Sequence, residues 1–487
     1  MKEEIRDKIN VNVTENLTYI KGLLKDNPDI VYREFYINEW KAVLMYIDGM
    51  ADKVLLDDFV MKSVMIWSDK VKSVNEIKDK LLTVTDMKEL QKLSDAINLM
   101  LSGECLLFVE GIPACYMFAV RSWSARSVGD PSGETTIRGA RDGFTETLRF
   151  NTALVRRRVR DTRLRIKFKP LGTRSKTDTA MMYIDDIVNK DLLKDFQSRI
   201  DKINIDAILD SSYVEQLVED NKYSLFPQVQ STERPDVVAA ALYEGRIALI
   251  VDNSPFAIIV PATLPTLLQS PDDYYLRWMN ASIIRLIRIF AVFMSIVLPA
   301  LYVAVTSFHT SIIPTKLAQS IAATREGVPF PAYVEAILME VSLAILMEAV
   351  IRLPKPIGST IGIVGGLIIG QSAVSAGIVS PIMIIIVSVT ALTNFITPNH
   401  EISYAFRYVR FLLIIASSFA GLYGIMLGLI VLLIHLVRLR SFGIPYLSPA
   451  ADLNIGDFKD MFVRFPTNLM RKRPKYMNTE DKIRQRS

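Results

Sequence analysis

The sequence predicts a duplicated α/β soluble domain at the N-terminal side, followed by an all-α transmembrane domain with four to five hydrophobic helices. Three observations support this fold class. Charged residues occur throughout 1–280, long apolar runs occupy 289–436, and two segments of the soluble half repeat. The predicted domains are α/β module 1 at 1–125, a basic linker at 126–170, module 2 at 171–280, the transmembrane domain at 281–437 and a basic cytoplasmic tail at 438–487.

The soluble half contains an internal repeat. The string MYID at 45–48 recurs at 182–185, and the element LLxDF at 55–59 recurs at 192–196 with the same spacing. Farther along, SGECLLFVEGIPACYMFAV at 102–120 parallels EGRIALIVDNSPFAIIVPA at 244–262. The offset between the copies grows by only a few residues, so we interpret them as two copies of one module.

Each copy is expected to begin with a strand that leads into a helix carrying the LLxDF element. A second helix and a hairpin of apolar strands complete the module, because β-branched and aromatic residues suit half-buried strands. The predicted bounds in the two copies are Trp40–Ile47 and Thr179–Ile184 for the strand, Asp86–Ser102 and Pro235–Glu244 for the second helix, and Glu110–Pro113 and Asp252–Pro255 for the hairpin turn. The charged stretch Asn75–Asn98 predicts a helix with a mostly solvated face.

The segment between the two copies is strongly basic. Residues 121–176 hold fifteen Arg and Lys against five Asp and Glu, and such an excess calls for an anionic partner. Lipid headgroups, nucleic acid or an acidic partner subunit could each supply it. The few aromatic residues of this segment do not alternate regularly with the arginines as a base-stacking surface would require, which disfavours nucleic acid. The candidate residues for coupling to a partner are Arg138, Arg156, Arg157 and Arg158.

Several apolar segments follow the soluble half. Ile289–Phe308 is long enough to span roughly 30 Å of hydrocarbon, and Arg285 and Arg288 place its start on the cytoplasmic side. Residues 272–277 resemble an interfacial collar. The later segments are Tyr333–Ile351, a glycine-rich stretch at 356–381, Pro381–Thr397 and Phe411–Val437. With both termini cytoplasmic the number of spans should be even, so either Tyr333–Ile351 or Pro381–Thr397 is interfacial or re-entrant.

Carboxylates interrupt one of these segments. On a helix, Glu340 and Glu348 lie within about 80° of each other while Glu335 points elsewhere. A carboxylate at bilayer depth is costly and therefore indicates a functional site. In one interpretation Glu340 and Glu348 face a wet cavity that attracts cations; in the other, the helix lies in the interface with its glutamates in water.

The glycine-rich stretch predicts a close helix contact. Its glycines recur every four residues and share one helix face: Gly358, Gly362, Gly366 and Gly370. Small residues at this spacing let two membrane helices approach closely. The ridge either packs inside one subunit or forms an intersubunit or pore-side face, and the few spans favour the second.

Enzymatic function is not predicted. Three histidines and two cysteines, Cys105 and Cys115, leave little for triad or metal chemistry. We therefore predict no catalytic residue, no metal site and no cofactor. The N-terminal MKEEIRDKIN lacks an apolar core, so no cleavable signal peptide is expected.

Six strings carry a resemblance to a known family over nearly the whole chain from about residue 40. They are 130–144 (containing IRG at 137–139), PQVQSTERPDVV at 227–238, EGRIALIVD at 244–252, SPDDYY at 270–275, REGVPFPA at 325–332 and the stretch 352–381. Together they resemble the A subunits of spore germinant receptors, the GerA family. Two departures are Ala140, where the family usually has proline, and Asp142, where it usually has glutamate.

The resemblance implies a multi-pass protein of the inner spore membrane with a two-part cytoplasmic domain. It implies a transporter-like B subunit that binds the nutrient, a lipoprotein C subunit, and a homo-oligomeric ring that opens a cation pathway to end dormancy. From the residues alone, a secondary transporter component or a membrane-anchored scaffold remains an alternative. A transporter would show more spans and repeated membrane halves, whereas here the repeat lies in the soluble half.

Overall fold

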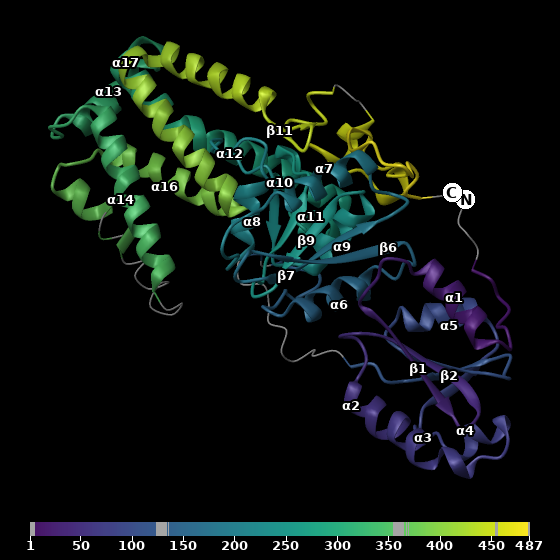
Figure 1. Cartoon of the computed structure of the whole chain (residues 1–487). Coiled ribbons are helices and arrows are strands. Elements are labelled where there is room, and N and C mark those ends of the chain that lie inside the picture. Colours follow the sequence, from purple (N-terminus) through teal and green to yellow (C-terminus); the bar gives the residue numbers. More distant parts are fainter. Residues whose placement is uncertain are drawn as a thin grey trace. The chain divides into compact units, whose positions relative to one another are not determined.

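The computed structural model describes residues 5–122, 134, 136–353, 365–366, 368, 370–452 and 456–485. The chain forms two compact units (Figure 1). Unit 1 consists of Met1–Lys222, Val229–Pro261 and Met470–Ser487, and unit 2 of Tyr223–Gln228 and Ala262–Leu469. Unit 2 therefore begins within the segment predicted as module 2, and the predicted tail is divided between the units.

Unit 1 contains two five-stranded antiparallel sheets with the same strand order, β1-β2-β4-β5-β3 and β6-β7-β9-β10-β8. The first sheet comprises β1 (Ile30–Ile37), β2 (Trp40–Ile47), β3 (Met87–Leu90), β4 (Cys105–Val109) and β5 (Cys115–Phe118). The second comprises β6 (Leu164–Leu171), β7 (Thr177–Ile184), β8 (Gln230–Thr232), β9 (Ile247–Val251) and β10 (Ala257–Val260). Two sheets of one topology agree with the sequence repeat.

The helices of unit 1 also occur in corresponding order. The first copy has α1 (Val13–Leu23), α2 (Lys53–Leu55), a π-helical turn (Leu56–Met61), α3 (Lys62–Trp67), α4 (Ile77–Lys80) and α5 (Leu93–Met100). The second has α6 (Leu148–Arg158), α7 (Lys190–Asp201), α8 (Ser211–Val218) and α9 (Pro235–Tyr243). In each copy one helix precedes the sheet and another leads into its central hairpin.

Helices cover both faces of the first sheet. Figure 1 shows α1 and α5 on one face and α2, α3 and α4 on the other. Each layer has its own apolar core: Val13, Leu17 and Ile97 pack under the first pair, and Val60 and Val64 under the second group. Because both faces are buried, the central strand β4 is buried along its whole length.

Most predicted elements of unit 1 are confirmed. Strand β2 has the predicted bounds, β7 starts two residues earlier than predicted, and the hairpins β4–β5 and β9–β10 turn where expected. The single helix predicted over Asp86–Ser102 is wrong, as is the long solvated helix over Asn75–Asn98. Residues Met87–Leu90 form β3, because Met87 pairs with Phe118 and Leu90 with Cys115 of β5; the helix α5 follows.

The predicted linker at 126–170 contains regular structure. It includes α6 and most of β6, whose residues pair with β7 from Leu164 opposite Ile184 to Leu171 opposite Thr177. The basic residues of β6 alternate with apolar ones, and Leu164 and Ile166 are buried. Alternation with period two is typical of a strand. The basic residues of β6 therefore lie on the face of the strand opposite to its buried apolar residues.

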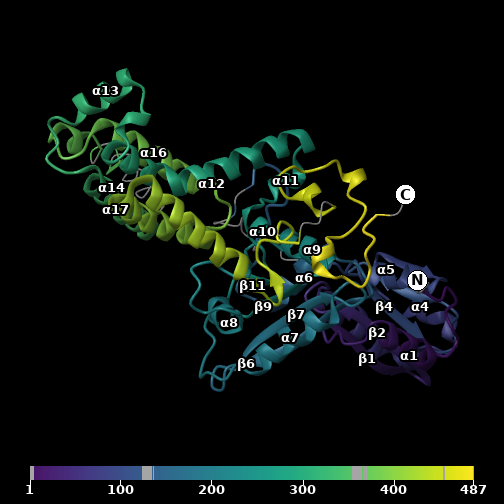
Figure 2. The ribbon, with the colours of Figure 1, turned by 90° about the horizontal axis from the view of Figure 1, so that it is seen from above.

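Unit 2 is mainly helical. Its helices are α10 (Leu264–Leu268), α11 (Asp272–Tyr275), α12 (Trp278–Ser307), α13 (Thr315–Arg325), α14 (Ala332–Arg352), α16 (Pro381–Ile396) and α17 (His400–Arg438), and residues 370–375 are also helical. A two-stranded hairpin, β11 (Arg440–Ser441) and β12 (Ile444–Pro445), follows α17. Figures 1 and 2 both show α12 alongside α17, its most extensive packing partner.

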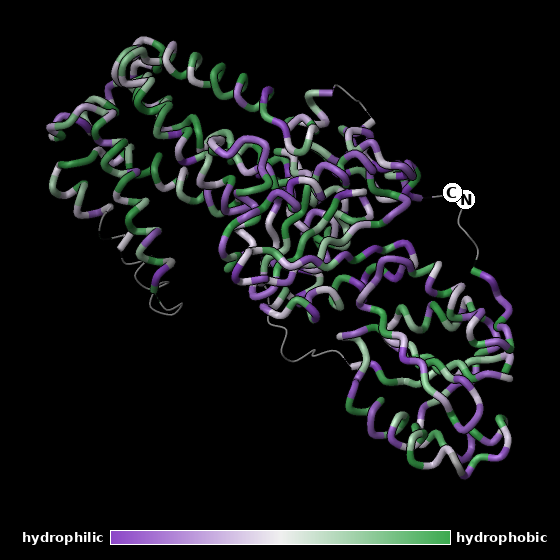
Figure 3. The backbone as a smooth tube through the Cα atoms, in the orientation of Figure 1, coloured by the Kyte–Doolittle hydropathy of each residue, from purple (hydrophilic) through white to green (hydrophobic). Residues whose placement is uncertain are grey.

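Two helices of the described chain are long and apolar enough to cross a membrane, Trp278–Ser307 and His400–Arg438, and Pro381–Ile396 is a shorter apolar helix. Figure 3 shows the hydrophobic character of these helices. The predicted single span Phe411–Val437 is interrupted, because Gly421 has φ 58° and ψ −135°. Helix α17 therefore consists of two arms, 400–420 and 422–438.

Candidate functional site

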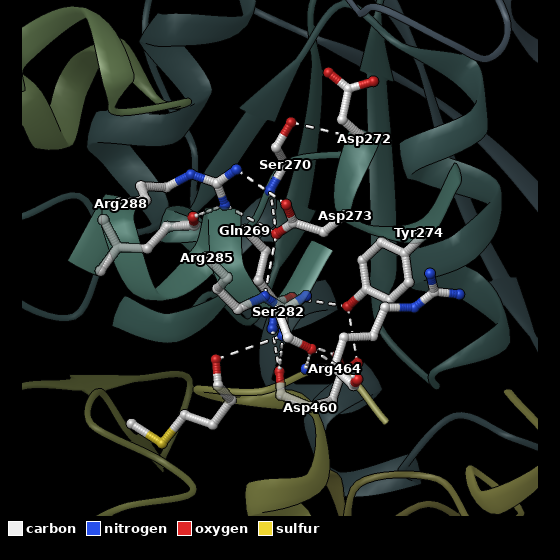
Figure 4. Close-up of polar contacts among 12 residues, drawn as sticks. Gln269, Ser270, Asp272, Asp273, Tyr274, Ser282, Arg285, Arg288, Asp460 and Arg464 are labelled. Carbon is white, nitrogen blue, oxygen red and sulfur yellow. Dashed lines mark hydrogen bonds and ion pairs between the residues drawn. The ribbon is translucent and has the colours of Figure 1, made fainter. Parts of the chain in front are cut away.

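Charged side chains are buried at the start of α12. Asp273, from the SPDDYY string, is 1% exposed and accepts hydrogen bonds from Arg285 Nε at 3.1 Å and from both terminal nitrogens of Arg288 at 2.9 Å (Figure 4). Arg288 also donates to the Leu268 carbonyl at 2.9 Å. The two arginines predicted to mark the cytoplasmic end of the first span are thus held by one carboxylate.

A later part of the chain completes this cluster. Arg285 Nη1 donates to the Asp460 carbonyl at 2.6 Å and to its carboxylate at 3.0 Å, and Tyr274 donates to the same carboxylate at 2.8 Å. The guanidinium of Arg464 lies 5.5 Å from the centre of the Tyr274 ring. Such charge-assisted bonds are geometrically specific, so the α12 cluster (Asp273, Tyr274, Arg285, Arg288, Asp460, Arg464) fixes the segment after α17 against the start of α12.

The two glutamates predicted to share a wet cavity have different surroundings. Glu340 of α14 is 2% exposed and lies 3.4 Å from Arg410 of α17, which is 1% exposed. Its Oε1 atom and Arg410 Nη1 have no hydrogen-bond partner within the described part of the protein. Glu348 is exposed and pairs with Arg352 one helical turn away, at 2.6 Å. Within one chain the two carboxylates therefore do not converge on one site.

Glu335 is the third carboxylate of α14 and is fully buried. Its Oε2 accepts a hydrogen bond from the backbone N–H of Ser380 at 2.9 Å, immediately before α16, and Arg325 lies 3.2 Å from its Oε1. A negative charge at a helix N-terminus is favourable, because unpaired N–H groups point toward it. Glu335 was not among the candidate residues predicted from the sequence, although the rule about carboxylates at bilayer depth applies to it as well.

The predicted glycine ridge is described only in part. Gly358 and Gly362 lie outside the residues that the structure describes. A Cβ added to Gly370 would touch Ile384 of α16 at 3.7 Å, an ordinary packing distance, whereas one added to Gly366 would meet nothing within 4 Å. Gly370 thus packs inside the chain, and Gly366 presents an open face.

Other glycines make a closer contact, which was not predicted from the sequence. A Cβ on Gly421 would lie 2.8 Å from His309 Cε1 and 2.9 Å from Phe308 Cβ, and one on Gly424 would collide with the Ala416 carbonyl. The two arms of α17 therefore fold back on each other as a tight helical hairpin. The spacing of Gly421, Gly424 and Gly428 within an apolar run was the available signal.

The four arginines predicted as coupling residues divide into two kinds. Arg156 is 1% exposed and forms a bidentate pair with Asp29 of the first copy, at 2.6 and 2.9 Å. Arg158 donates to both oxygens of Asp142 at 2.5 and 2.6 Å. Burial opposes ionisation of Asp142, but these bonds outweigh it and hold the pKa of that carboxyl below its usual value. Arg138 and Arg157 are exposed.

The segment before α6 is attached to the second copy by Arg234, from the string PQVQSTERPDVV. This side chain is fully buried and donates to the carbonyls of Glu134 and Ala140 at 3.1 and 2.9 Å. Only the Ala140 carbonyl takes part, so the family's usual proline could accept the same bond. Burial raises the pKa of the Glu134 carboxyl to about 7, although hydrogen bonds from Thr232 and the Glu233 N–H lower it.

Metal or redox chemistry has no support in the described residues. They contain no group of three or more His, Cys, Asp or Glu side chains that could hold a metal ion. Cys105 and Cys115 are free and buried on adjacent strands, and burial raises the pKa of both thiols.

Comparison with known sequences identifies the family. The sequence profile described as "Bacillus/Clostridium GerA spore germination protein" matches residues 18–476. The chain belongs to the GerA family. It is 41% identical over 485 residues to the spore germination protein KA of Bacillus subtilis (strain 168), covering 98% of this chain and 89% of that protein. It is 40% identical to spore germination protein B1 of the same organism, over 98% of this chain and all of that protein.

Further GerA proteins have similar identities. The spore germination protein GerLA of Bacillus cereus is 38% identical, with 96% of each chain covered. Among solved structures, the N-terminal domain of the A subunit of the Bacillus megaterium spore germinant receptor GerK3 matches 54% of this chain and 99% of its own, with 32% identity and a TM-score of 0.43. The family profile and the curated relatives confirm the resemblance seen in the six strings over nearly the full length.

Proposed function

We propose that this GerA chain is the A-type subunit of a nutrient-sensing germination receptor, and that copies of it form a ring with a cation pathway in the inner spore membrane. The similarity to spore germination proteins over 98% of the chain supports the receptor role. A transporter-like B subunit and a lipoprotein C subunit would be its partners, as the family resemblance implies. Neither catalysis nor a cofactor is part of this proposal.

The observation that carries the pathway is the buried Glu340–Arg410 pair between α14 and α17. Two opposite charges in an apolar bundle stabilise little relative to apolar residues, because their desolvation offsets their attraction. A separation of α14 from α17 would expose the Glu340 carboxylate to water and provide a cation-attracting group. In the closed state Glu340 and Arg410 would be paired. Nutrient binding to a partner subunit would favour the open state, because the nutrient would bind more tightly to the receptor in that state.

We further propose that α12, α14 and both arms of α17 cross the membrane, with both ends of the chain in the cytoplasm, and that the shorter apolar helix α16 is re-entrant. The break at Gly421 supports two crossings in place of the single span predicted over Phe411–Val437. Of the four arginines predicted for coupling, Arg138 and Arg157 have exposed side chains, and we propose that these two contact a partner or headgroups. Arg156 and Arg158 hold the soluble unit together through their carboxylate partners.

The test is nutrient-evoked cation release from spores that carry single substitutions, and cation flux in liposomes that contain all three subunits. Glu340→Gln should change the flux at unchanged protein level, since it removes the carboxylate and leaves the shape. Glu348→Gln is the matched control on the same helix, because Glu348 is exposed and pairs only one turn away. Gly366→Leu should block assembly or conduction through its open face.

A scaffold role is the second candidate, because the predicted carboxylates do not converge within one chain. In that case Arg410→Met would lower the amount of receptor, and Glu340→Gln would leave the flux per receptor unchanged. Absence of any nutrient-evoked flux in liposomes with all three subunits would exclude the channel and favour the scaffold.

A further inference from the structure

A segment far along the sequence belongs to the second α/β copy. Residues 470–487 are part of unit 1, although the residues before them, 262–469, form unit 2. Residues 470–485 fold into a loop that is closed by a backbone bridge between Lys472 and Ile483. We name this loop the strap, because it returns the chain from unit 2 to unit 1.

Arg473 is the main anchor of the strap. Its side chain is 8% exposed and donates from Nε to the Tyr243 carbonyl at 2.7 Å, at the end of α9. Its Nη1 donates to the carbonyls of Asp481 and Ile483 within the strap, at 3.0 and 2.7 Å. A positive charge is favourable at a helix C-terminus, where carbonyls lack helical partners. One guanidinium therefore holds both the shape of the strap and its place on α9.

The strap also bonds to the turn between β7 and α7. The Glu480 N–H donates to the Ile187 carbonyl at 3.1 Å. The next N–H, from Asp481, donates to the Asp186 carbonyl at 3.2 Å. These bonds join backbone groups, so they depend on the path of the strap across the second copy.

Gly245, which follows α9, makes room for the strap. It has φ +86°, and a Cβ at this position would lie 2.4 Å from Thr479 Cγ2 of the strap. Such an approach is possible because glycine has no Cβ. Thr479 and Met477 are buried, at 4% and 2% exposure. The surface of the second copy is therefore shaped to receive the strap.

The first copy fills the same place with a different part of the chain. In the alignment of the two copies, Met50 corresponds to Ile187 and Gly103 to Gly245. The Met50 carbonyl accepts a hydrogen bond from the Ser122 N–H at 3.0 Å. Ser122 follows β5 closely in the sequence. The first copy is therefore completed by the residues that continue from its own hairpin.

The second copy is not completed in that way. Ser122 corresponds to Leu264, which belongs to unit 2 and donates its N–H to the Tyr446 carbonyl at 2.8 Å. Glu480 of the strap takes, at the Ile187 carbonyl, the position that Ser122 takes in the first copy. The strap thus replaces the residues that the chain carries into unit 2.

The residues before the strap are anchored to the start of α12. Arg464 Nη1 donates to the Leu276 carbonyl at 2.8 Å, and its N–H donates to Ser282 Oγ at 3.1 Å (Figure 4). Arg464 in unit 2 and Arg473 in unit 1 are thus two anchors of one continuous segment. A chain extends by at most about 3.5 Å per residue, so the anchors can separate only by the extended length of residues 464–473.

We propose that the strap is a tie between the second α/β copy and the start of α12, and that it must be docked for the nutrient signal to pass between the soluble unit and the membrane helices. This signalling role rests on the proposed receptor function. The docking site does not rest on it, because the site is defined by the end of α9, Gly245 and the Ile187 carbonyl.

Docking is tested on the full-length chain in detergent, with a protease site inserted between Leu469 and Met470 and cleaved after purification. The freed strap should remain bound during gel filtration. Arg473→Met should release it, because this change removes the donor to the Tyr243 carbonyl. Lys472→Met, at the exposed neighbouring position, is the matched control and should retain the strap. Equal retention in the two variants, or release from the otherwise unchanged chain, would overturn the docking site.

The tie is tested in spores by lengthening it. An insertion of about ten Gly and Ser residues between Leu469 and Met470 is flexible and leaves both anchors in place. It should slow nutrient-evoked cation release by at least about fivefold, the lower end of typical coupling between sites, at unchanged receptor level. The same residues appended after Ser487 are the control and should leave the rate unchanged.

A normal rate in spores that carry the insertion would overturn the tie, and docking would then only complete the second copy. A normal rate with Arg473→Met, when that variant releases the strap in detergent, would also overturn it. Absence of any nutrient response from the unmodified receptor would overturn the proposed function and with it the signalling role. The detergent experiment would still decide whether the docking site exists.

Discussion

The two α/β copies share their topology and local signals but differ in what their helices bury. In both, an aspartate at the end of the MYID string pairs with a lysine five residues later: Asp48 with Lys53 at 2.8 Å, and Asp185 with Lys190. In both, Asp52 or Asn189 caps the next helix by accepting N–H bonds from its first turn. The local motif therefore fixes the turn and the helix start, whereas packing decides which side faces the sheet.

A second difference concerns how the copies are joined. Helix α6 packs on the second sheet through Leu154 and Val155, yet its Arg156 reaches Asp29 of the first copy. Arg149 of the same helix pairs with Asp48. One helix thus belongs to both copies, and the corresponding α1 has no such dual role among its described contacts. Duplication alone would have given two copies in which the first helix contacts only its own sheet. The charged residues of α6 add contacts with the first copy, and this makes the two copies different.

The largest expected effect on stability concerns the phenylalanine of the LLxDF element, which is buried in one copy and exposed in the other. Phe196→Ala should lower the free energy of unfolding of the soluble unit by about 4 kcal/mol, since it leaves a cavity in a packed core. Phe59→Ala should change it by less than about 1 kcal/mol, because that ring is already half exposed. Pulse proteolysis of the full-length chain in detergent, across a urea series, measures both. Equal effects would mean that the two rings are packed alike.

The next prediction concerns the ion pair between Arg156 and Asp29, which connects α6 to the first copy. Arg156→Met leaves the Asp29 carboxylate buried without its partner and should cost about 3 kcal/mol of unfolding free energy. Arg157→Met, its exposed neighbour, should have an effect within about 0.5 kcal/mol. The double variant Asp29→Leu, Arg156→Met should regain part of the loss. If Arg156→Met matches Arg157→Met under the same urea series, the pair does not hold the copies together.

The smallest effect concerns pH and the attachment of the segment before α6. Burial raises the folded-state pKa of Glu134 from 4.5 to about 7, so the folded state retains a proton that the unfolded state releases. This contribution to stability is complete below about pH 4.5 and declines as pH rises toward 7. The protection of the amides of residues 136–147, corrected for the intrinsic pH dependence of exchange, should fall across that window, and Glu134→Gln should remove this fall. An unchanged pH profile in the variant would exclude Glu134 as its source.

Part of this architecture was readable from local sequence. The repeat, the bounds of β2, the hairpins and the presence of α14 and α16 follow from periodicity and turn residues, which act over a few positions. The errors occurred where partners distant in sequence decide. β3 is a strand because β5 pairs with it, and α17 is a hairpin because Gly421 lies against Phe308 and His309.

The candidate sites show the same division. The sequence marked Glu340 as a costly carboxylate and Arg156 as part of a basic segment, and family strings marked Arg234 and Asp273. Only the fold brought Arg410 to Glu340, Asp29 to Arg156, and Asp460 to Arg285. Each partner lies tens of residues or more away in the chain, where no periodic pattern connects the two positions.

By itself, then, the sequence determined the duplicated α/β half, the apolar helical half and the family, because these depend on composition, short-range period and shared strings. The tertiary structure alone decided which charges are neutralised, which glycines permit close approach, and that Phe59 faces outward while Phe196 faces the core. The physical reason is that the burial of a side chain depends on every element packed around it.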